Sequence, residues 1–397
     1  MTDDGRTMKR PGDVVVPLGL IAAEWTRIGL TGFGGPPAHI ALLRRLVVER
    51  QGWLDAQEFE DANAACGLLP GPASTQLALF CAYRVGGVPG ALVGGLGFVV
   101  PAVVLILALS VLFLGPAPPI WVRGAGAGAG AAVVAVAVHA GRALIGPSFQ
   151  RVREQRSRSA RWAGYLVAGL AAAALIGPYL VLVLFACGLT ELTVVRARSG
   201  TLALNWSPVA ALAHQIGASG GTAALAWTAF KVGALSFGGG FVIIPLMQGD
   251  AVHVYHWMTN AQFLGAVALG QITPGPVVAT VAAVGYAAHG VAGGILAAAV
   301  AFAPSFSFIM LGGGRFQRIR QNAHARAFLD GAGPAAIGAI FGAAITLAGA
   351  LSQSWQFAIL AAAAVLLLAL GRGVVATLLL AAGAGVIVAL AGAPLPH

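Results

Sequence analysis

The sequence predicts an all-α polytopic membrane protein made of two inverted-topology repeats with broken or re-entrant helices. Three observations lead to this prediction: the composition, a duplicated segment with helix breaks, and loop charges that alternate between the two copies. Hydrophobic residues make up 58% of the 397 residues and charged residues only 9%, whereas a soluble domain carries roughly 25% charged residues. Backbone that faces lipid must satisfy its own hydrogen bonds, so we expect the crossing segments to be helices.

Apolar stretches long enough to cross a bilayer recur along the chain. A hydrocarbon core of ~30 Å needs ~20 apolar residues per helix, and the stretches predict about 10–13 membrane helices. The Gly-rich run 124–130 suits close helix packing, and it lacks the Lys-Ser or Lys-Thr pair of a phosphate-binding loop. The apolar stretches are 89–114, 119–145, 161–195, 291–312, 327–350, 354–370 and 374–393.

One segment occurs twice at a constant offset of 204 residues, which maps Phe33 onto Phe237. Each copy holds a Phe-Gly-Gly motif followed by a Pro-Gly-Pro motif. Gly and Pro interrupt helices, and paired interruptions in apolar segments are the best sequence pointer to a transport site. The chain is then divided into a cytoplasmic N-terminal segment 1–13, a first repeat 14–200, a connector or extra crossing 201–221, and a second repeat 222–397.

Loop charges indicate that the two repeats have opposite orientations. The loop after the first break carries Arg44, Arg45 and Arg50, whereas its counterpart, 248–260, has no Lys or Arg. The difference changes sign at each of the next two loops, as the positive-inside rule requires of an inverted pair. Inversion also needs an odd number of crossings between equivalent points, for which 201–218 is the candidate. The alternative is a parallel repeat with a surface helix at 201–218.

With both motifs present in order in each copy, the chain resembles the chromate ion transporter (CHR) family. It is similar to the long-chain members in which two homologous halves are fused. The resemblance implies a multi-pass carrier in the plasma membrane that expels chromate, driven by the proton gradient, and a relation to sulfate, a dianion of similar size and shape. The stretches that carry the resemblance are 29–43, 68–87, 233–247 and 272–290.

A tetrahedral dianion that crosses a membrane must exchange its hydration shell for hydrogen-bond donors and positive charge. The half-helix that begins after each break offers free N–H groups and the positive end of a helix dipole. Ser74, Thr75 and Gln76 add side-chain donors in the first copy. The expected substrate-binding residues are Arg27, Gly34, Gly35, Pro70, Gly71, Pro72, Ser74, Thr75, Gln76, Lys231, Gly238, Gly239, Pro274, Gly275 and Pro276.

Arg27 and Lys231 occupy matching positions in otherwise apolar segments, each shortly before a Phe-Gly-Gly motif. A charge inside the membrane is costly and is a functional hypothesis by default. We therefore expect the two side chains to converge on one anion near the bilayer midplane. The alternative is that they reach toward the interface, or that Arg27 pairs with Glu24 one turn away.

Proton coupling requires a titratable group, and the candidates are Glu24, Asp61 and His39. Thr228 stands at the position of Glu24 in the second copy, and Gly265 at that of Asp61, so the two copies are chemically unequal. His39 could instead be a capped or interfacial histidine. Asp61 could belong to the polar start of a helix, where the dipole favours an acidic residue.

Other classes of function remain as alternatives. The sequence 217–220 resembles the Gly-x-Ser-Gly of rhomboid-type serine proteases, but Ser219 lies outside the repeats and no HExxH or GxGD motif is present. Within transport, the alternative substrates are sulfate, another oxyanion or an organic anion. We expect no enzymatic activity and no cofactor. We expect no metal site, since the three cysteines form no CxxC pair, and no nucleic-acid partner, since most of the basic residues lie in loops, where they set membrane orientation. A homodimer is compatible with the sequence.

Overall fold

The computed structural model describes residues 16–67, 71–150, 152–153, 155–175, 177, 180–199, 221–236, 242–312 and 322–396. All regular elements within these ranges are helices, and five of them are long and apolar enough to cross a membrane. Large apolar side chains such as Leu96, Val104 and Ile295 are exposed on their outer faces, as contact with lipid requires. The predicted class, an all-α polytopic membrane protein, is confirmed. The predicted N-terminal segment 1–13 lies outside the described residues.

The helices of the two repeats follow one another in matching order. Two π-helices, η1 and η3, even begin and end at equivalent positions. The first repeat contains α1 (Leu18–Thr31), α2 (Pro36–Arg44), η1 (Arg45–Arg50), α3 (Ala56–Cys66), α4 (Ala73–Phe113), α5 (Ile120–Gln150), α6 (Arg156–Leu175) and α7 (Leu180–Ser199). The second contains α9 (Thr222–Ala234), α10 (Ile243–Gln248), η3 (Gly249–Val254), α11 (Asn260–Ile272), η4 (Val277–Thr280), α12 (Val281–Gly312), α14 (Ala323–Gly349), α15 (Ser354–Ala364), η6 (Val365–Ala369) and α16 (Val374–Leu390).

The two longest elements, α4 and α12, each consist of two helices joined by a sharp reversal at glycine. Gly87 has φ +59° and Gly290 has φ +63°, a conformation that L side chains avoid. Beyond the turn in α4 the chain folds back, so that a Cβ on Gly94 would lie 2.6 Å from Cβ of Ala82. Each Pro-Gly-Pro motif is therefore followed by a short half-helix that runs toward one end of the molecule. The chain reverses direction there, and the longer second part of the helix crosses the molecule.

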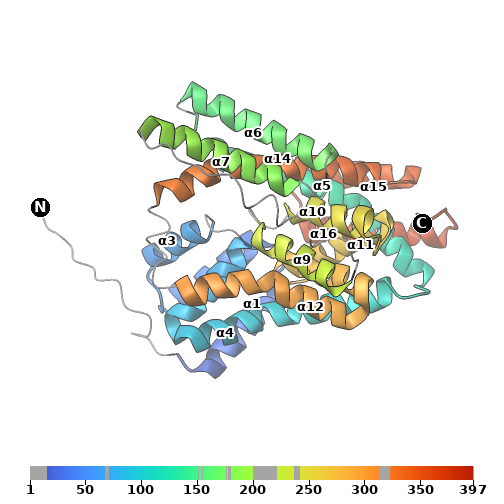
Figure 1. Ribbon diagram of the computed structural model, residues 1–397. Helices are drawn as coiled ribbons and strands as arrows, with labels where there is room; N and C mark the ends of the chain where they lie inside the picture. The colour runs from blue at the N-terminus through green and yellow to red at the C-terminus, as the bar shows by residue number, and fades with distance from the viewer. Residues whose placement is uncertain are drawn as a thin grey trace, which may run out of the picture.

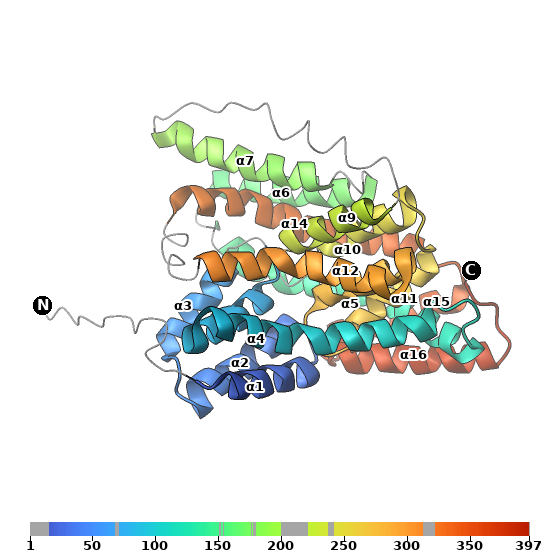
Figure 2. The same cartoon turned by 60° about the horizontal axis from the view of Figure 1, so that its bottom comes forward.

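The repeats are inverted relative to each other. The crossing part of α4 and that of α12 lie side by side and run in opposite directions (Figures 1 and 2). Helix α7 ends at one end of the molecule, and α9 begins at the other (Figure 2). This placement agrees with the opposite orientations that the loop charges predict. The proposed extra crossing, 201–218, lies outside the described residues.

The last helices of each repeat pack against the other repeat. Helix α14 lies against α6 and α7, and α5 lies against α15 and α16. Small residues allow this close approach: a Cβ on Gly124 would lie 2.5 Å from Cβ of Ala389, and one on Gly130 would lie 2.9 Å from Cβ of Leu264. The Gly-rich run 124–130 is thus confirmed as a helix-packing surface.

The first Phe-Gly-Gly motif breaks the chain between α1 and α2, as predicted. Gly34 and Gly35 have φ +101° and +73°, and α2 begins at Pro36, whose ring suits the first turn of a helix. Before the break, Gly29 allows α1 to approach α4, because a Cβ there would lie 2.8 Å from the Phe98 carbonyl oxygen. The second Phe-Gly-Gly, including Gly238 and Gly239, lies outside the described residues.

Candidate functional site

The broken segments of the two repeats meet at the carbonyl oxygen of Gly32, just before the first break. The backbone N–H of Gly275, in the second Pro-Gly-Pro, donates a hydrogen bond of 3.1 Å to this oxygen. His39 Nε2 lies 2.9 Å from the same atom, and its Nδ1 lies 3.3 Å from Ser74 Oγ. With Nε2–H donating to Gly32, the neutral ring leaves Nδ1 to accept from the Ser74 hydroxyl. His39 and the Gly32 carbonyl oxygen together therefore link three of the four predicted breaks.

The His39 ring is fully buried and meets the ring of Phe98 edge-on, with centroids 5.1 Å apart. The ring therefore lies in the protein interior, beside the first break. Both ring nitrogens face polar partners, so protonation of Nδ1 would require Ser74 to change its role from donor to acceptor. A role for His39 in proton coupling stays a prediction.

The first Pro-Gly-Pro loop opens directly into the half-helix at the start of α4. Gly71 has φ +119°, and α4 begins at Ala73 with no side-chain cap from Pro72. Ser74, Thr75 and Gln76 follow in the first turn and are 3%, 0% and 0% exposed. The structure thus places these predicted donors together in the interior, at a helix N-terminus. Pro70 lies outside the described residues.

The second Pro-Gly-Pro loop has a similar backbone and different surroundings. Gly275 has φ +99°, and a Cβ there would lie 2.7 Å from Cβ of Ala102 on α4. Thr280, at the position equivalent to Gln76, donates its hydroxyl to the Val277 carbonyl oxygen at 2.7 Å. Pro274 and Pro276 flank this buried turn. The loop is therefore packed against apolar groups, and its polar groups bond within the protein.

Arg27 lines a cavity of about 160 Å³ between α1, α2 and η1. Arg45 and Arg50 also line it, together with Glu24, so three arginines face one carboxylate. Glu24 lies 3.8 Å from Arg27 and forms an ion pair with Arg50. The Arg27 side chain remains 61% exposed. This cavity is net positive and can attract an anion.

Lys231, the counterpart of Arg27, has a different environment. Its Nζ lies 2.5 Å from Oδ2 of Asp250, and the two side chains are only 13% and 4% exposed. The Thr228 hydroxyl donates to the same carboxylate at 2.7 Å. Arg27 and Lys231 therefore have different partners, since each lies beside a carboxylate of its own repeat. Their convergence on one anion stays a prediction. Sequence reasoning assigned Asp250 to a loop and missed this pairing.

Asp61 lies on α3 and accepts a hydrogen bond of 3.2 Å from Gln57 Nε2 one turn earlier. The helix is capped by Asp55, which accepts from the Glu58 N–H at 2.7 Å, so this region is also the polar start of a helix. Glu58 forms a second contact that sequence reasoning missed, an ion pair of 2.5 Å with Arg84 on α4. That pair ties α3 to the half-helix after the first Pro-Gly-Pro.

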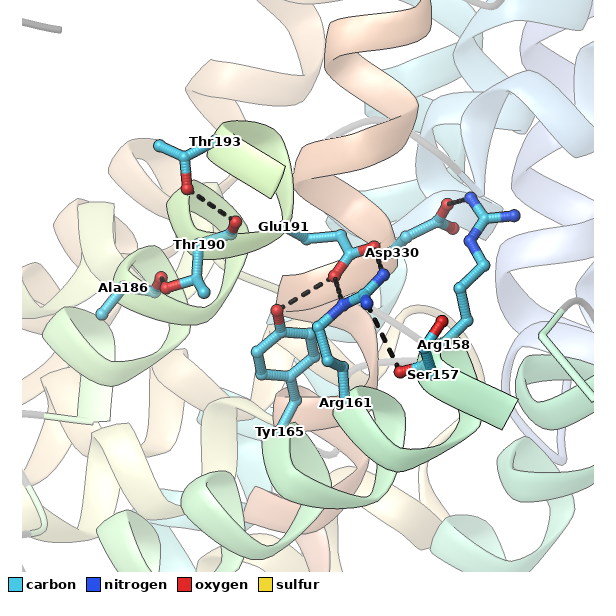
Figure 3. Close-up of polar contacts among 9 residues, drawn as sticks. All are labelled: Ser157, Arg158, Arg161, Tyr165, Ala186, Thr190, Glu191, Thr193 and Asp330. Atoms are coloured by element: carbon cyan, nitrogen blue, oxygen red, sulfur yellow. Dashed lines mark hydrogen bonds and ion pairs between the residues drawn. The ribbon is translucent and has the colours of Figure 1, made fainter. Parts of the chain in front are cut away.

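A further charged network was also missed, and it joins α6, α7 and α14 (Figure 3). Glu191 lies in the apolar helix α7 and is 4% exposed. Arg161 donates to its two carboxylate oxygens at 2.7 and 2.8 Å, and the Tyr165 hydroxyl donates at 3.0 Å. Arg158 lies 3.8 Å from Asp330 on α14. Glu191 is the sole acidic residue of the apolar stretch 161–195, which is the signal that could have identified it.

The other predicted candidate, Ser219 of the protease-like sequence, lies outside the described residues. In the described part of the chain, no group of three or more His, Cys, Asp or Glu side chains could hold a metal ion. The features that the structure does bring together are the breaks around Gly32, the buried donors after Gly71, and two separate charged clusters at Arg27 and Lys231.

Comparison with known proteins shows the same two-part organisation. A family model described as chromate transporter matches residues 20–192 and 223–388. The chain is 32% identical over 335 residues to the chromate transport protein of Cupriavidus metallidurans, covering 81% of this chain and 80% of that protein. It is 31% identical over 347 residues to the chromate transport protein of Pseudomonas aeruginosa, covering 82% and 80%. No solved structure matches the chain.

Proposed function

Because the chain belongs to the chromate transporter family, we propose that it is a secondary transporter that exports chromate across the plasma membrane, driven by the proton-motive force. The observation that carries the proposal is the uncapped, buried start of α4, where Ser74, Thr75 and Gln76 gather after a Pro-Gly-Pro break. Hydrogen-bond donors at a helix N-terminus suit an oxyanion. Repeats 14–200 and 222–397 would supply the two halves of the carrier.

Charge distribution supports export. By the positive-inside rule, the end of the molecule that carries Arg44, Arg45 and Arg50 is cytoplasmic. The cavity beside Arg27 opens between the helices of this end and is net positive. A dianion in the cytoplasm would therefore be drawn toward the protein before it reaches the breaks.

Energetics also favour the outward direction. Moving one elementary charge across a membrane potential is worth about 2.3 kcal/mol per 100 mV. A dianion leaving a cell that is negative inside would therefore release about 4.6 kcal/mol per 100 mV. Proton entry could add to this driving force through Glu24, Asp61 or His39, which we propose as coupling residues.

The test is the chromium content of cells that carry the gene, compared with cells that lack it. We expect lower chromium in the cells that carry the gene, and loss of the difference when an uncoupler collapses the proton-motive force. The measurement is repeated with excess sulfate. Chromium that stays high in cells carrying the gene when sulfate is in excess would indicate that sulfate competes with chromate for the same carrier. Equal chromium content in the two strains would overturn export.

Orientation is tested separately by cysteine labelling. Cysteine in place of Arg45 should react with an impermeant reagent only from the cytoplasmic side, and cysteine in place of the exposed His253 only from the outside. Labelling of both positions from the same side would contradict the proposed orientation.

A further inference from the structure

We propose that the anion is held at the first Pro-Gly-Pro loop alone, and that Ser305, from the second repeat, completes that site. The inference rests on the proposed transport of an oxyanion and specifies where the anion binds. Although the motif is duplicated, the two loops have different roles. The first loop binds the anion, and the second loop stabilises the first break by a hydrogen bond to Gly32.

Two buried hydroxyls identify the first loop as the binding loop. Thr75 Oγ1 and Ser305 Oγ are each fully buried, and neither has a hydrogen-bond partner among the described residues. A buried hydroxyl without a partner costs free energy, so such groups call for an explanation such as an absent ligand. Thr75 lies in the first turn of α4, and Ser305 approaches the same loop from α12.

Gly71 marks the point where Ser305 meets the first turn of α4. A Cβ on this residue would lie 3.2 Å from Ser305 Oγ and 2.5 Å from Gln76 Nε2. The hydroxyl of one repeat and the amide of the other therefore flank the same backbone position. Glycine at this position lets a ligand approach the main chain closely.

The backbone adds further donors at the same place. Among the first-turn residues of α4, Gln76 already donates its N–H to the Pro72 carbonyl oxygen at 3.0 Å. The N–H groups of Ala73, Ser74 and Thr75 precede it at the start of the helix, where intrahelical acceptors are absent. Main-chain N–H groups and the side chains of Thr75, Gln76 and Ser305 can thus replace the water around a tetrahedral anion.

The turn that follows the second loop lacks these hydroxyls, and the unpartnered donor nearest to it in sequence is Gln271 Nε2, three residues before Pro274. Its Gly275 N–H donates to Gly32, and the Thr280 hydroxyl donates to Val277. Val278 and Ala279 stand at the positions equivalent to Ser74 and Thr75. No unpartnered hydroxyl comparable to Thr75 therefore remains in this turn within the described ranges.

The helices that pack against the two loops also differ, because α12 offers a hydroxyl to the first loop and α4 offers an apolar surface to the second. Pro101 stands at the position on α4 that is equivalent to Ser305 on α12. The neighbouring Ala102 presents its methyl group to Gly275. The second loop therefore packs against an apolar wall where the first loop meets a hydroxyl, and its bond to Gly32 fixes the end of α1.

The test is oxyanion binding by the purified full-length protein, measured with chromate and with sulfate by equilibrium dialysis. Ser305→Ala and Thr75→Val should each weaken binding about 10-fold, as expected for loss of one hydrogen bond to a charged ligand. Ser305→Thr, which keeps the hydroxyl, should bind within a few-fold of the wild type. Thr280→Val is the matched control in the second loop and should bind as tightly as the wild type.

Saturation should occur at one anion per chain. Undiminished binding in both Ser305→Ala and Thr75→Val would overturn the inference, and so would a stoichiometry of two. An equal loss of binding in Thr280→Val would also overturn it, because the second loop would then bind. Chromate flux, measured after the same protein is reconstituted into liposomes, separates the two proposals. Binding of sulfate without flux of chromate would contradict the proposed function but not the proposed binding site.

Discussion

Replacement of Asp250 by Asn leaves Lys231 as a buried cation without a counter-charge. In the native protein Nζ and Oδ2 are 2.5 Å apart, and the carboxylate side chain is 4% exposed. Asn keeps an oxygen that can accept the Thr228 hydroxyl, so the variant removes the charge while largely preserving the hydrogen bond. The effect measured is therefore that of the ion pair.

The expected magnitude follows from burial. Removal of one partner from a buried ion pair destabilises a protein by about 3–5 kcal/mol, whereas replacement of both partners by neutral groups is often without net effect. Asp250→Asn should therefore be strongly destabilised, and Lys231→Met combined with Asp250→Asn should recover most of the loss. The exposed pair of Arg44 and Glu49, with side chains 40% and 53% exposed, supplies the control. Glu49→Gln should change stability by about 0–1 kcal/mol.

The assay is thermal inactivation in detergent, followed as the fraction of protein that stays monodisperse after heating. Unfolding of a membrane protein of this size need not be reversible, so the variants are compared by the order of the temperatures at which half of the protein is no longer monodisperse. The predicted order places Asp250→Asn well below both the double variant and Glu49→Gln. A double variant as unstable as the sum of its two single variants would contradict the ion pair's proposed contribution, because it would show no coupling between the two side chains.

Three further predictions concern the cavity, the first loop and the α6–α7–α14 network. Arg27→Ala should raise the KM for chromate several-fold in vesicle flux at low ionic strength and weaken its salt dependence, because the cavity loses positive charge; an unaltered salt dependence would contradict this role. Gly71→Ala should abolish flux, since φ is +119° and a Cβ would meet Gln76 at 2.5 Å, with strain of about 1–3 kcal/mol; wild-type rates would argue against close packing. Glu191→Gln should lower stability by about 3 kcal/mol, because Arg161 loses its counter-charge, and a changed KM at unchanged stability would disprove a structural role.

Much of the scaffold could be predicted from sequence because it depends on local chemistry. Consecutive glycines followed directly by prolines favour the end of one helix and the start of the next, so the break between α1 and α2 was predictable. The constant offset carried the same prediction to the second repeat, and η1 and η3 begin at equivalent residues. Alternating loop charges predicted the inversion, because charge sets membrane orientation independently of packing.

The partners across helices could not be predicted, because they depend on tertiary packing. Asp250 follows a break in the sequence and looks like a loop residue, yet the π-helix η3 buries it against Lys231. Matching positions also proved insufficient: Arg27 and Lys231 share a place in the repeat, but each is near a different carboxylate. Ser305 carries no motif and is recognisable only through its position beside Gly71.

Chromate transport by this protein is tested most directly as flux by the purified protein in proteoliposomes under an imposed membrane potential. We predict flux above that of protein-free liposomes for the wild type and for Glu49→Gln, and none above background for Gly71→Ala. Wild-type flux equal to that of protein-free liposomes, in protein that elutes as a folded species, would contradict this prediction.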